Sequence, residues 1–417
     1  MKFLFVHQNM PGQYREMLQW LVSHDEHEIV FLTQRDAAPM MAGVTVVSYK
    51  PHTKAASNAY ALSKVWEDAA GFGYGAVMAA EKYQKKTGFK PDVILGHTGW
   101  GELLFFKQLW PDVPVLGFFE YYYNRTGGLV GFDPSDPPSE ASRYILQARN
   151  TVPLTSIEGV DLGVVPTAWQ RNTFPESVRS RLYTCHDGIR TDLLRPDPNV
   201  KLGLGRLKQP LTRDDEVFTY LARNLEHARG FHIFMRALPR ILQERPNSRV
   251  IILGGNEVSY GRKSSNPDGL RAEMEAEIGD RVDWSRVHFL GRVPYSKFVS
   301  IVQLSKCHIY LTMPFVLSWS LLEAMSMEAT VVSSDVAPVR EAIKHGKTGL
   351  LVDFFDVDAL ADQVIEVLAN PAKYASIGPE ARAHVVEKYD FLTRCLPEHI
   401  RQINSLVPDS LSLSAPP

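Results

Sequence analysis

Two arginines in the second half of the chain have the chemistry to bind a diphosphate. Arg223 and Arg229 lie between an expected strand at residues 217–221 and an expected helix at residues 231–243. A guanidinium group binds phosphate oxygens through paired hydrogen bonds, and the N-terminus of a following helix adds backbone N–H donors. Two arginines in a solvated loop would give the same local sequence, so this segment alone leaves both interpretations open.

A second segment, at residues 314–325, places hydroxyl groups and a carboxylate where another helix is expected to begin. Ser318 or Ser320 can cap a helix that starts near Leu321. Glu323 would then lie in the first turn, where a carboxylate can accept hydrogen bonds from both hydroxyls of a ribose. In isolation, a glutamate favoured by the helix dipole is the simpler explanation.

Polar and aromatic side chains also follow three expected strands in the first half of the chain, at residues 3–6, 92–95 and 113–118. The carboxyl ends of parallel strands line the ligand crevice of such a sheet. Glycine permits close backbone approach, and aromatic rings beside a carboxylate suit the faces and hydroxyls of a sugar. The same residues would also suit turns and corners of a core. The candidates are Gly12, His97, Trp100, Glu120, Tyr121 and Tyr123.

The elements that must position these residues follow a strand, helix, strand pattern in both halves of the chain. Short apolar runs alternate with helical stretches, and the pattern restarts at Val217. This repetition predicts an α/β protein with two doubly wound parallel-sheet domains. A stretch rich in Pro, Gly and charge predicts a linker, and a Ser/Pro-rich end predicts disorder. The expected divisions are a domain at 1–200, the linker at 201–215, a domain at 216–390, a helix at 391–407 and a disordered tail at 408–417.

Composition excludes several classes of protein. The 417 residues include 45 Lys and Arg and 47 Asp and Glu, and the resulting net charge of −2 predicts no nucleic-acid partner. Three widely spaced cysteines fit a reducing cytosol. The apolar run near the N-terminus is too short for a signal peptide, and no run is long enough to span a membrane. We therefore expect a cytoplasmic protein and leave peripheral contact with the inner face of a membrane open.

The motifs of several other enzyme classes do not occur in the sequence. It contains no HExxH, GxSxG or P-loop motif and no zinc-ligand spacing. The glycine-rich run at residues 71–75 lies in an expected helical stretch at 55–83 rather than after a strand, so it is not a dinucleotide fingerprint. No GxGxxG opens either expected domain, which argues against a nicotinamide oxidoreductase.

The two segments of the second half together resemble the C-terminal half of the retaining glycosyltransferases of family 4, which have the GT-B fold. Arg223 matches an arginine that binds the donor diphosphate in that family. Arg229-Gly230 resembles the Lys-Gly element, with Arg for Lys and one extra residue of spacing. Glu323 matches the second glutamate of the E-x7-E motif. Phe315 stands where the family has the first glutamate, which usually helps hold the donor sugar.

Further segments extend the resemblance from about residue 217 to residue 368. Residues 289–293 look like the loop that meets the nucleotide base, and residues 329–334 resemble the buried strand after the motif. The segments at 338–341 and 345–352 resemble the next parts of the family sequence. In the first half, the loop with Gly12 is similar to one that faces the donor phosphates, and His97 resembles a cleft histidine near the donor sugar.

The resemblance implies two Rossmann-like domains that face each other across a cleft, with the donor mainly on the second domain and residues 391–407 returning to the first. It implies transfer of a hexose-type sugar from a nucleotide-sugar with retention, by a front-face mechanism that needs no metal and no cofactor. Bacterial polysaccharide, glycoconjugate or natural-product biosynthesis is the expected setting, with a glycan, lipid-linked or small-molecule acceptor. The implied catalytic residues are Arg223, Arg229 and His97; the donor-binding residues are Gly12, Arg292, Ser318, Trp319, Ser320, Leu321 and Glu323; the acceptor-binding residues are Glu120, Tyr121, Tyr123 and Trp100.

Phe315 keeps an alternative open. A degenerate GT-B protein could bind a sugar nucleotide or a partner enzyme without turnover, and loss of the first motif glutamate favours that interpretation. The retained Arg223, Arg229 and Glu323 weigh against it. A GT-B epimerase or phosphorylase fits less well, because the segments described above resemble family 4.

Overall fold

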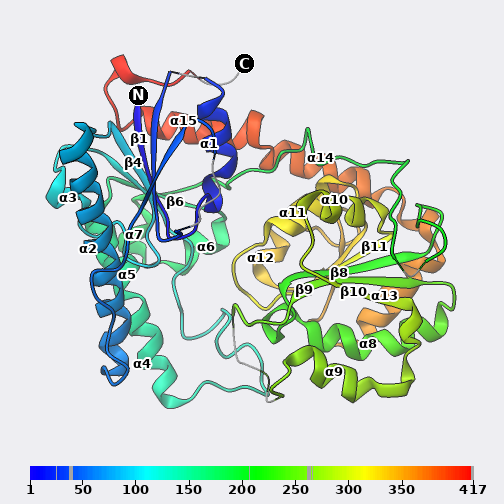
Figure 1. Ribbon diagram of the computed structural model, residues 1–417. Helices are drawn as coiled ribbons and strands as arrows, with labels where there is room; N and C mark the ends of the chain where they lie inside the picture. Colours follow the sequence, from blue (N-terminus) through cyan, green and yellow to red (C-terminus); the bar gives the residue numbers. More distant parts are fainter. Residues whose placement is uncertain (25, 37–40, 206, 261–263, 265, 415–417) are drawn as a thin grey trace. The chain divides into compact units, whose positions relative to one another are not determined.

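The computed structural model describes residues 1–24, 26–36, 41–205, 207–260, 264 and 266–414. The chain divides into two compact units. Unit 1 comprises Met1–Thr126, Asp133–Gly188 and Phe391–Pro417, and unit 2 comprises Gly127–Phe132 and Ile189–Asp390. Each unit is built on its own β-sheet (Figure 1). The predicted α/β architecture with two parallel sheets is confirmed.

Within the described residues, unit 1 carries a seven-stranded parallel sheet in the order β3-β2-β1-β4-β5-β6-β7. Its strands are β1 (Lys2–Val6), β2 (Glu28–Thr33), β3 (Val44–Ser48), β4 (Val93–His97), β5 (Val115–Phe118), β6 (Leu162–Val165) and β7 (Leu182–Thr184). Its helices are α1 (Arg15–Val22), α2 (Ala61–Thr87), α3 (Phe106–Leu109), α4 (Glu140–Arg149), α5 (Thr151–Ser156), α6 (Ala168–Thr173), α7 (Glu176–Arg179) and α15 (Leu396–Asn404).

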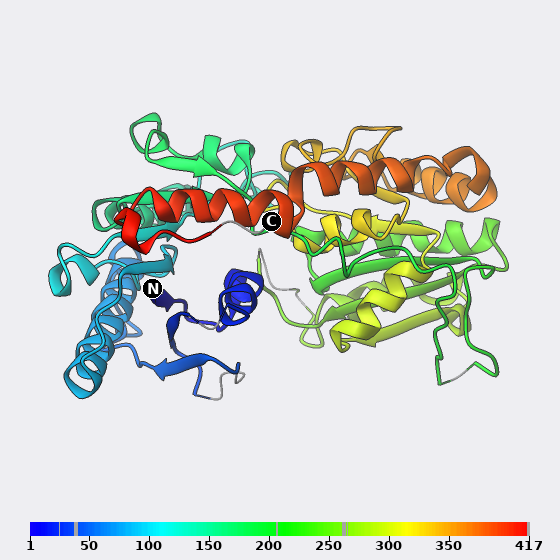
Figure 2. The ribbon, with the colours of Figure 1, turned by 90° about the horizontal axis from the view of Figure 1, so that it is seen from above.

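The central strands of unit 1, β2, β1, β4, β5 and β6, are mostly apolar and are buried on both faces. In β1, Phe3 and Phe5 join a core with α1 and α15, whereas Leu4 and Val6 join a core with α2 on the opposite face. Helices α1 and α15 can be followed on one side of the sheet and α2 on the other (Figures 1 and 2). The alternation of side chains along a strand thus produces two cores from one apolar run.

Within its described residues, unit 2 carries a six-stranded parallel sheet in the order β10-β9-β8-β11-β12-β13. Its strands are β8 (Val217–Asn224), β9 (Arg249–Gly255), β10 (Val287–Gly291), β11 (Cys307–Tyr310), β12 (Val331–Ser334) and β13 (Leu350–Val352). Its helices are α8 (Phe231–Glu244), α9 (Leu270–Ile278), α10 (Tyr295–Leu304), α11 (Trp319–Ser326), α12 (Ala337–Arg340), α13 (Val357–Ala369) and α14 (Ile377–Tyr389). Two cores again cover the two faces.

The expected linker at 201–215 is instead part of unit 2. The chain passes from unit 1 to unit 2 at Gly188–Ile189. Leu202 and Leu211 pair in an antiparallel bridge, and both side chains are buried in a core of unit 2 together with Leu204. The Pro, Gly and charge content of this stretch concealed these spaced apolar residues, whose burial ties the segment to the unit.

The C-terminal segment belongs to unit 1 and is ordered further than expected. From Phe391 onward the chain is part of unit 1, and α15 contributes to the same core as Phe3 and Phe5. Beyond α15, Asn404 holds the end of the chain, because its side chain accepts from Leu413 N at 2.8 Å and donates to Leu413 O at 2.9 Å. Leu413 is buried. The predicted disorder is therefore corrected for residues 408–414, and residues 415–417 lie outside the described part.

The glycine-rich run at 71–75 lies inside helix α2, as the sequence predicts. A Cβ at Gly71 would lie 2.1 Å from Thr53 O, and one at Gly75 would lie 2.1 Å from Lys50 O. The glycines therefore let the segment after β3 pack its backbone directly onto the helix. This close packing gives the glycine-rich run a structural explanation.

Candidate functional site

The order of strands reverses at one point in each sheet, between β1 and β4 in unit 1 and between β8 and β11 in unit 2. Ligands of open parallel sheets bind outside the carboxyl ends of the strands at such a point. The predicted arginines follow β8, the segment at 314–323 follows β11, and His97 ends β4. Each unit therefore has a candidate site of its own.

Arg229 is fixed between the two central strands of unit 2. Its side chain is buried, and Nη1 donates to Thr312 Oγ1 at 2.7 Å and to Tyr310 OH at 3.5 Å. The next residue, Gly230, has a φ of +65°, and a Cβ there would lie 2.5 Å from Leu311 Cβ. A glycine is thus required for the chain to bring Arg229 this close to the end of β11.

Arg223 lies at the end of β8 and, unlike Arg229, is not held by any side chain that the structure describes. Its side chain is exposed, and it makes no hydrogen bond or ion pair with any residue that the structure describes. Its charge acts on Glu226, whose carboxylate it stabilises at a distance. The two predicted arginines therefore differ: one is held in place by the fold, and one is available to an incoming anion.

Glu226 lies in the loop between these arginines and is 1% exposed. Its Oε2 accepts from Ser259 N at 3.0 Å and from Tyr260 N at 2.7 Å, while Oε1 has no hydrogen-bond partner among the described residues. Burial raises the pKa of this carboxyl, and the two amide hydrogen bonds and both arginines oppose that shift. The sequence analysis did not single out Glu226.

Phe315, which occupies the position of the first motif glutamate, is a packed aromatic residue. It is 4% exposed, and its ring centroid lies 4.8 Å from that of Tyr260. The Tyr260 ring also lies 5.4 Å from the Arg229 guanidinium carbon. Tyr260 therefore joins the arginine, the replaced motif position and, through its backbone, Glu226.

The segment before Glu323 differs in detail from the expectation. Helix α11 begins at Trp319 rather than near Leu321, so Glu323 is not in its first turn. Ser318 occupies the N-cap position, but its hydroxyl contacts Ser320 Oγ at 2.9 Å and makes no capping hydrogen bond. Its N–H donates to Tyr310 OH at 3.1 Å. Trp319 is partly exposed, and Leu321 is buried in the core.

Glu323 is buried and its Oε1 accepts from Tyr295 OH at 2.6 Å. Tyr295 begins α10, so this hydrogen bond links α10 to α11. The predicted ribose-binding carboxylate thus already has a structural partner, which orients it. Tyr295 is a neighbour that the sequence analysis missed.

Arg292 follows β10 and meets the last residue of β8 and the loop after β9. Its Nη2 donates to Glu257 Oε2 at 2.6 Å and to Asn224 Oδ1 at 3.1 Å. A Cβ on Gly255 would lie 2.3 Å from that Glu257 oxygen and 2.6 Å from Asn224 Oδ1. The glycine at the end of β9 therefore permits three strand ends to meet, and Arg292 is partnered rather than free.

The candidate site of unit 1 is a cluster of rings. His97 stacks on Trp100 with centroids 4.1 Å apart, and His7 approaches both edge-on at 5.4 Å and 5.2 Å. Backbone N–H groups of Asn9 and Gly99 donate to Nδ1 of His7 and His97, at 2.8 Å and 2.9 Å. The neutral form of each ring therefore carries its proton on Nε2. Burial, and then the neighbouring His97, lower the pKa of His7 to about 3.

Gly12 and Glu120 border this cluster. Gly12 has a φ of +54°, and a Cβ there would lie 2.9 Å from His7 Nε2. In this structure the absence of a side chain at Gly12 therefore lets the backbone pack against the His7 ring. Glu120 Oε2 lies 3.7 Å from His97 Nε2. His7 was overlooked as a candidate, although it follows β1 as His97 ends β4.

The tyrosines after β5 are placed differently from Glu120. Tyr121 packs against Trp169 at 5.9 Å and against Tyr123 at 5.0 Å. Asn150 bonds both backbone groups of Tyr123, accepting from N at 2.9 Å and donating to O at 2.8 Å. These contacts support the alternative that the two tyrosines form a corner of the core, and their predicted contact with an acceptor stays a prediction.

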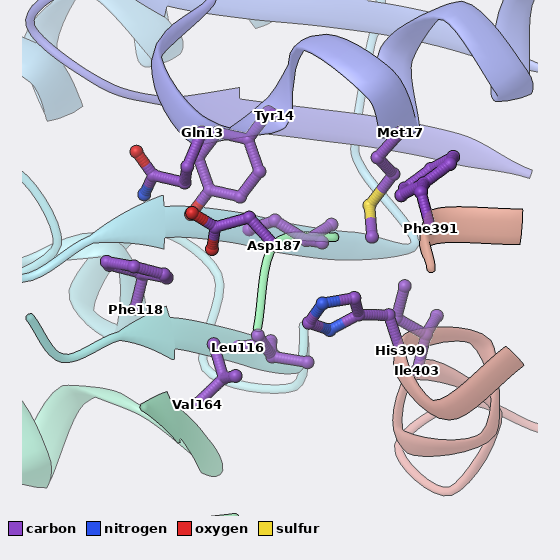
Figure 3. A pocket seen from close by; sticks show the side chains of 11 residues that line it. Gln13, Tyr14, Met17, Leu116, Phe118, Val164, Asp187, Phe391, His399 and Ile403 are labelled. Carbon is purple, nitrogen blue, oxygen red and sulfur yellow. The ribbon is translucent and has the colours of Figure 1, made fainter. Parts of the chain in front are cut away.

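A small cavity lies beneath the turn between β1 and α1 (Figure 3). Tyr14 and Asp187 both line it, and the C-terminal segment contributes Phe391 and His399 to its wall. Burial raises the pKa of Tyr14. The C-terminal segment therefore supports the turn that carries Gly12.

Two further observations bear on the sequence predictions. In the part of the chain that the structure describes, no group of three or more His, Cys, Asp or Glu residues is arranged to hold a metal ion. Among the same residues, no helix is both long and apolar enough to pass through a bilayer.

Family models match both halves of the chain. The model for the glycosyl transferase family 4 group matches residues 25–194, and the model for glycosyl transferases group 1 matches residues 206–384. The chain belongs to this family of glycosyltransferases. The resemblance stated from the residues alone is confirmed.

Curated relatives of this glycosyltransferase include mannosyltransferases and inositol glycosyltransferases. A GDP-mannose-dependent alpha-(1-6)-phosphatidylinositol monomannoside mannosyltransferase of Mycolicibacterium smegmatis is 24% identical over 50% of this chain and 52% of its own length. A lipopolysaccharide core biosynthesis mannosyltransferase of Rhizobium leguminosarum is 26% identical over 39% and 43%. The match thus spans about half the length of such relatives. A D-inositol 3-phosphate glycosyltransferase of Corynebacterium aurimucosum is 24% identical over 77% and 71%.

Solved structures establish the fold. Sucrose-phosphate synthase from Thermosynechococcus elongatus has a TM-score of 0.71 and 16% identity, covering 97% of this chain and 99% of that one. Anabaena HepE in complex with UDP-glucose has a TM-score of 0.66 and 15% identity, covering 97% and 100%. The glycosyltransferase therefore has the GT-B fold that the resemblance implies.

Proposed function

We propose that this protein transfers a hexose-type sugar from a nucleotide-sugar to an acceptor hydroxyl, with retention of anomeric configuration and without a metal. The observation that carries the proposal is the pair of arginines at the reversal point of unit 2, in a chain that belongs to a glycosyltransferase family. One arginine is fixed by Thr312 and the other is exposed. Together they suit a donor diphosphate, whose negative charge rises as it departs.

In the proposed step, the bond between the anomeric carbon and the diphosphate oxygen breaks. A bond forms between that carbon and the acceptor oxygen on the same face, and the acceptor proton passes to the departing phosphate. The products are a glycoside and a nucleoside diphosphate. Arg223 and Arg229 stabilise the developing charge, and Arg229, which is already held by Thr312, does so without reorganisation at the moment of reaction. Glu323 holds the ribose, and Arg292 lies beside the base.

We place the acceptor on unit 1, which carries the ring cluster of His7, His97 and Trp100. His97 has its ring fixed by Trp100 and by the Gly99 N–H, and its Nε2 is the nitrogen directed toward Glu120. We assign His97 to the donor sugar and Glu120 to the acceptor. A lipid-linked glycan is the favoured acceptor class, because two of the relatives are named for phosphatidylinositol mannoside and lipopolysaccharide core synthesis.

The test is a panel of UDP-, GDP-, ADP- and dTDP-sugars in the presence of EDTA, scored by release of the nucleoside diphosphate and by thermal stabilisation. Release from one donor that persists in EDTA is expected, and NMR of the transferred sugar should show the anomeric configuration of the donor. Release that EDTA abolishes would overturn metal independence. An inverted product would overturn the retaining mechanism.

A binding protein without turnover is the second candidate, and the packing of Phe315 favours it. If one nucleotide-sugar stabilises the protein and no acceptor in a set of glycolipid extracts and simple glycosides causes nucleotide release, this candidate replaces the first. No stabilisation by any donor would contradict both.

A further inference from the structure

We propose that Glu226 holds a hydroxyl of the donor sugar, in place of the glutamate that the family motif has at the position of Phe315. The inference rests on the proposed function, because it requires a nucleotide-sugar at the carboxyl end of β8. It assigns to the loop after β8 both the diphosphate and part of the sugar.

The position of Phe315 cannot supply the missing polar contact. A phenyl ring accepts no hydrogen bond from a hydroxyl in the way that a carboxylate does, and this ring is buried against Tyr260. The aromatic pair fills the space with apolar surface. A donor sugar in this protein therefore needs a hydroxyl acceptor from another element.

A single residue, Tyr260, contacts both Glu226 and Phe315. Tyr260 donates its backbone N–H to Glu226 Oε2 at 2.7 Å, and its side chain carries the ring that packs on Phe315. The same ring lies against the guanidinium of Arg229. One tyrosine thus contacts the replaced motif residue, the proposed diphosphate ligand and the carboxylate that we assign to the sugar.

One oxygen of the Glu226 carboxylate has no hydrogen-bond partner among the described residues. Oε2 accepts two backbone hydrogen bonds, and Oε1, although fully buried, accepts none from the described residues. A buried oxygen of this kind is unfavourable until a donor reaches it. Sugar hydroxyls are such donors, whereas the oxygens of the diphosphate group, which we assign to Arg223 and Arg229, are acceptors.

A purely structural role is the competing explanation. In that case Glu226 only anchors the loop after β9 through Ser259 and Tyr260, and its removal would affect every ligand of unit 2 equally. The two explanations separate when the affinity for a nucleotide-sugar is compared with the affinity for its nucleoside diphosphate, because only the first ligand carries the sugar hydroxyls.

The experiment uses Glu226→Gln in the full chain. The amide oxygen of glutamine can still accept from Ser259 N and Tyr260 N, while its NH₂ group replaces Oε1. Binding of UDP-glucose and UDP, and of GDP-mannose and GDP, is measured by calorimetry. For the pair that the wild type recognises, we expect the dissociation constant of the nucleotide-sugar to rise about 10- to 100-fold, as for loss of a hydrogen bond to a charged group. The constant of the nucleoside diphosphate should stay within about twofold.

Glu244→Gln is the matched control. It makes the same substitution at an exposed residue at the end of α8, where the carboxylate pairs with Arg240. We expect no change in either constant. Phe315→Glu combined with Glu226→Gln is the rescue: a carboxylate returned to the motif position should recover part of the lost affinity for the nucleotide-sugar. Thermal unfolding of each variant checks that it is folded.

The outcomes are distinct. If the wild type binds a nucleotide-sugar more tightly than its nucleoside diphosphate and Glu226→Gln removes that difference, the inference is supported. If the variant keeps the difference, or weakens both ligands equally, Glu226 has no sugar contact and the inference is wrong. If the wild type binds no nucleotide-sugar, the proposed function fails and the inference fails with it.

Discussion

The two sheets share one strand order but carry different chemistry at their points of reversal. In unit 1, the point between β1 and β4 holds stacked rings, with His7 kept neutral by burial. In unit 2, the point between β8 and β11 holds two arginines and a buried glutamate. The shared topology decides where a ligand can bind, and the side chains there decide what it can be.

The difference determines which chemical groups each point of reversal suits. A buried, neutral His7 gives little electrostatic stabilisation to a diphosphate, but the ring faces and polar edges around it suit a sugar or an acceptor. Fixed and exposed guanidinium groups suit a diphosphate. Substitutions at the two points should therefore have different consequences.

The largest effect is expected for Arg223→Ala. Loss of one charge-stabilising donor should cost about 2–4 kcal/mol of transition-state stabilisation, seen as a fall in kcat of roughly 10²–10³-fold. The melting temperature should hardly change, because the side chain is exposed and has no described partner. Arg249→Ala is the control, since Arg249 begins β9 at the opposite edge of the same sheet. Turnover close to that of the wild type would reject the assignment.

An effect of similar size, on stability rather than on turnover, is expected for Gly230→Ala. The new Cβ would meet Leu311 Cβ at 2.5 Å in a backbone with φ of +65°. Backbone strain and overpacking together should cost about 2–4 kcal/mol of unfolding free energy. Gly346→Ala separates the two causes, because its φ is +74° and nothing lies within 4 Å of the new Cβ. Its cost should be only about 1–2 kcal/mol, from backbone strain. Equal losses in chemical denaturation would show that the contact with β11 is unimportant.

The sequence predicted the elements and residues that can be identified from a short stretch of chain. Apolar runs located the buried strands, and Arg223 and Arg229 could be selected because they lie at the end of β8 and just before α8. Glu323 could be selected through the family motif, although the helix begins earlier than expected. The position of the glycines at 71–75 inside a helix was predicted correctly for the same reason.

The sequence did not predict what depends on distant segments meeting. Glu226 and Tyr260 are 34 residues apart, and nothing in either local sequence indicates their hydrogen bond. Leu202 and Leu211 lie in a stretch whose composition is typical of a linker, yet they are buried by a core formed elsewhere in unit 2. Local patterns describe elements, whereas the partners of a buried carboxylate follow from the packing of loops.

The smallest effect is expected in unit 1, where the prediction concerns pH. The pKa of His7 is lowered from 6.5 to about 3, first by burial, then by His97, with Arg35 acting in the same direction and the Asn9 N–H and Gln13 opposing. Between these values the unfolded chain binds a proton that the folded protein does not, so the free energy of unfolding falls as pH is lowered from about 6.5 toward 3. His7→Asn should reduce that fall, because an asparagine oxygen can accept from Asn9 N and does not titrate.

The loss of acid sensitivity should be partial, because burial also lowers the pKa of His186 and of His308 to about 3. Urea midpoints at pH 7.5, 6 and 5 measure the effect, with His24→Asn, at an exposed histidine, as the control. A wild-type pH dependence in His7→Asn would mean that the ring cluster takes up a proton without unfolding. His7 would then not stay neutral in the folded protein at acid pH, and its contrast with the charged arginines of unit 2 would no longer hold.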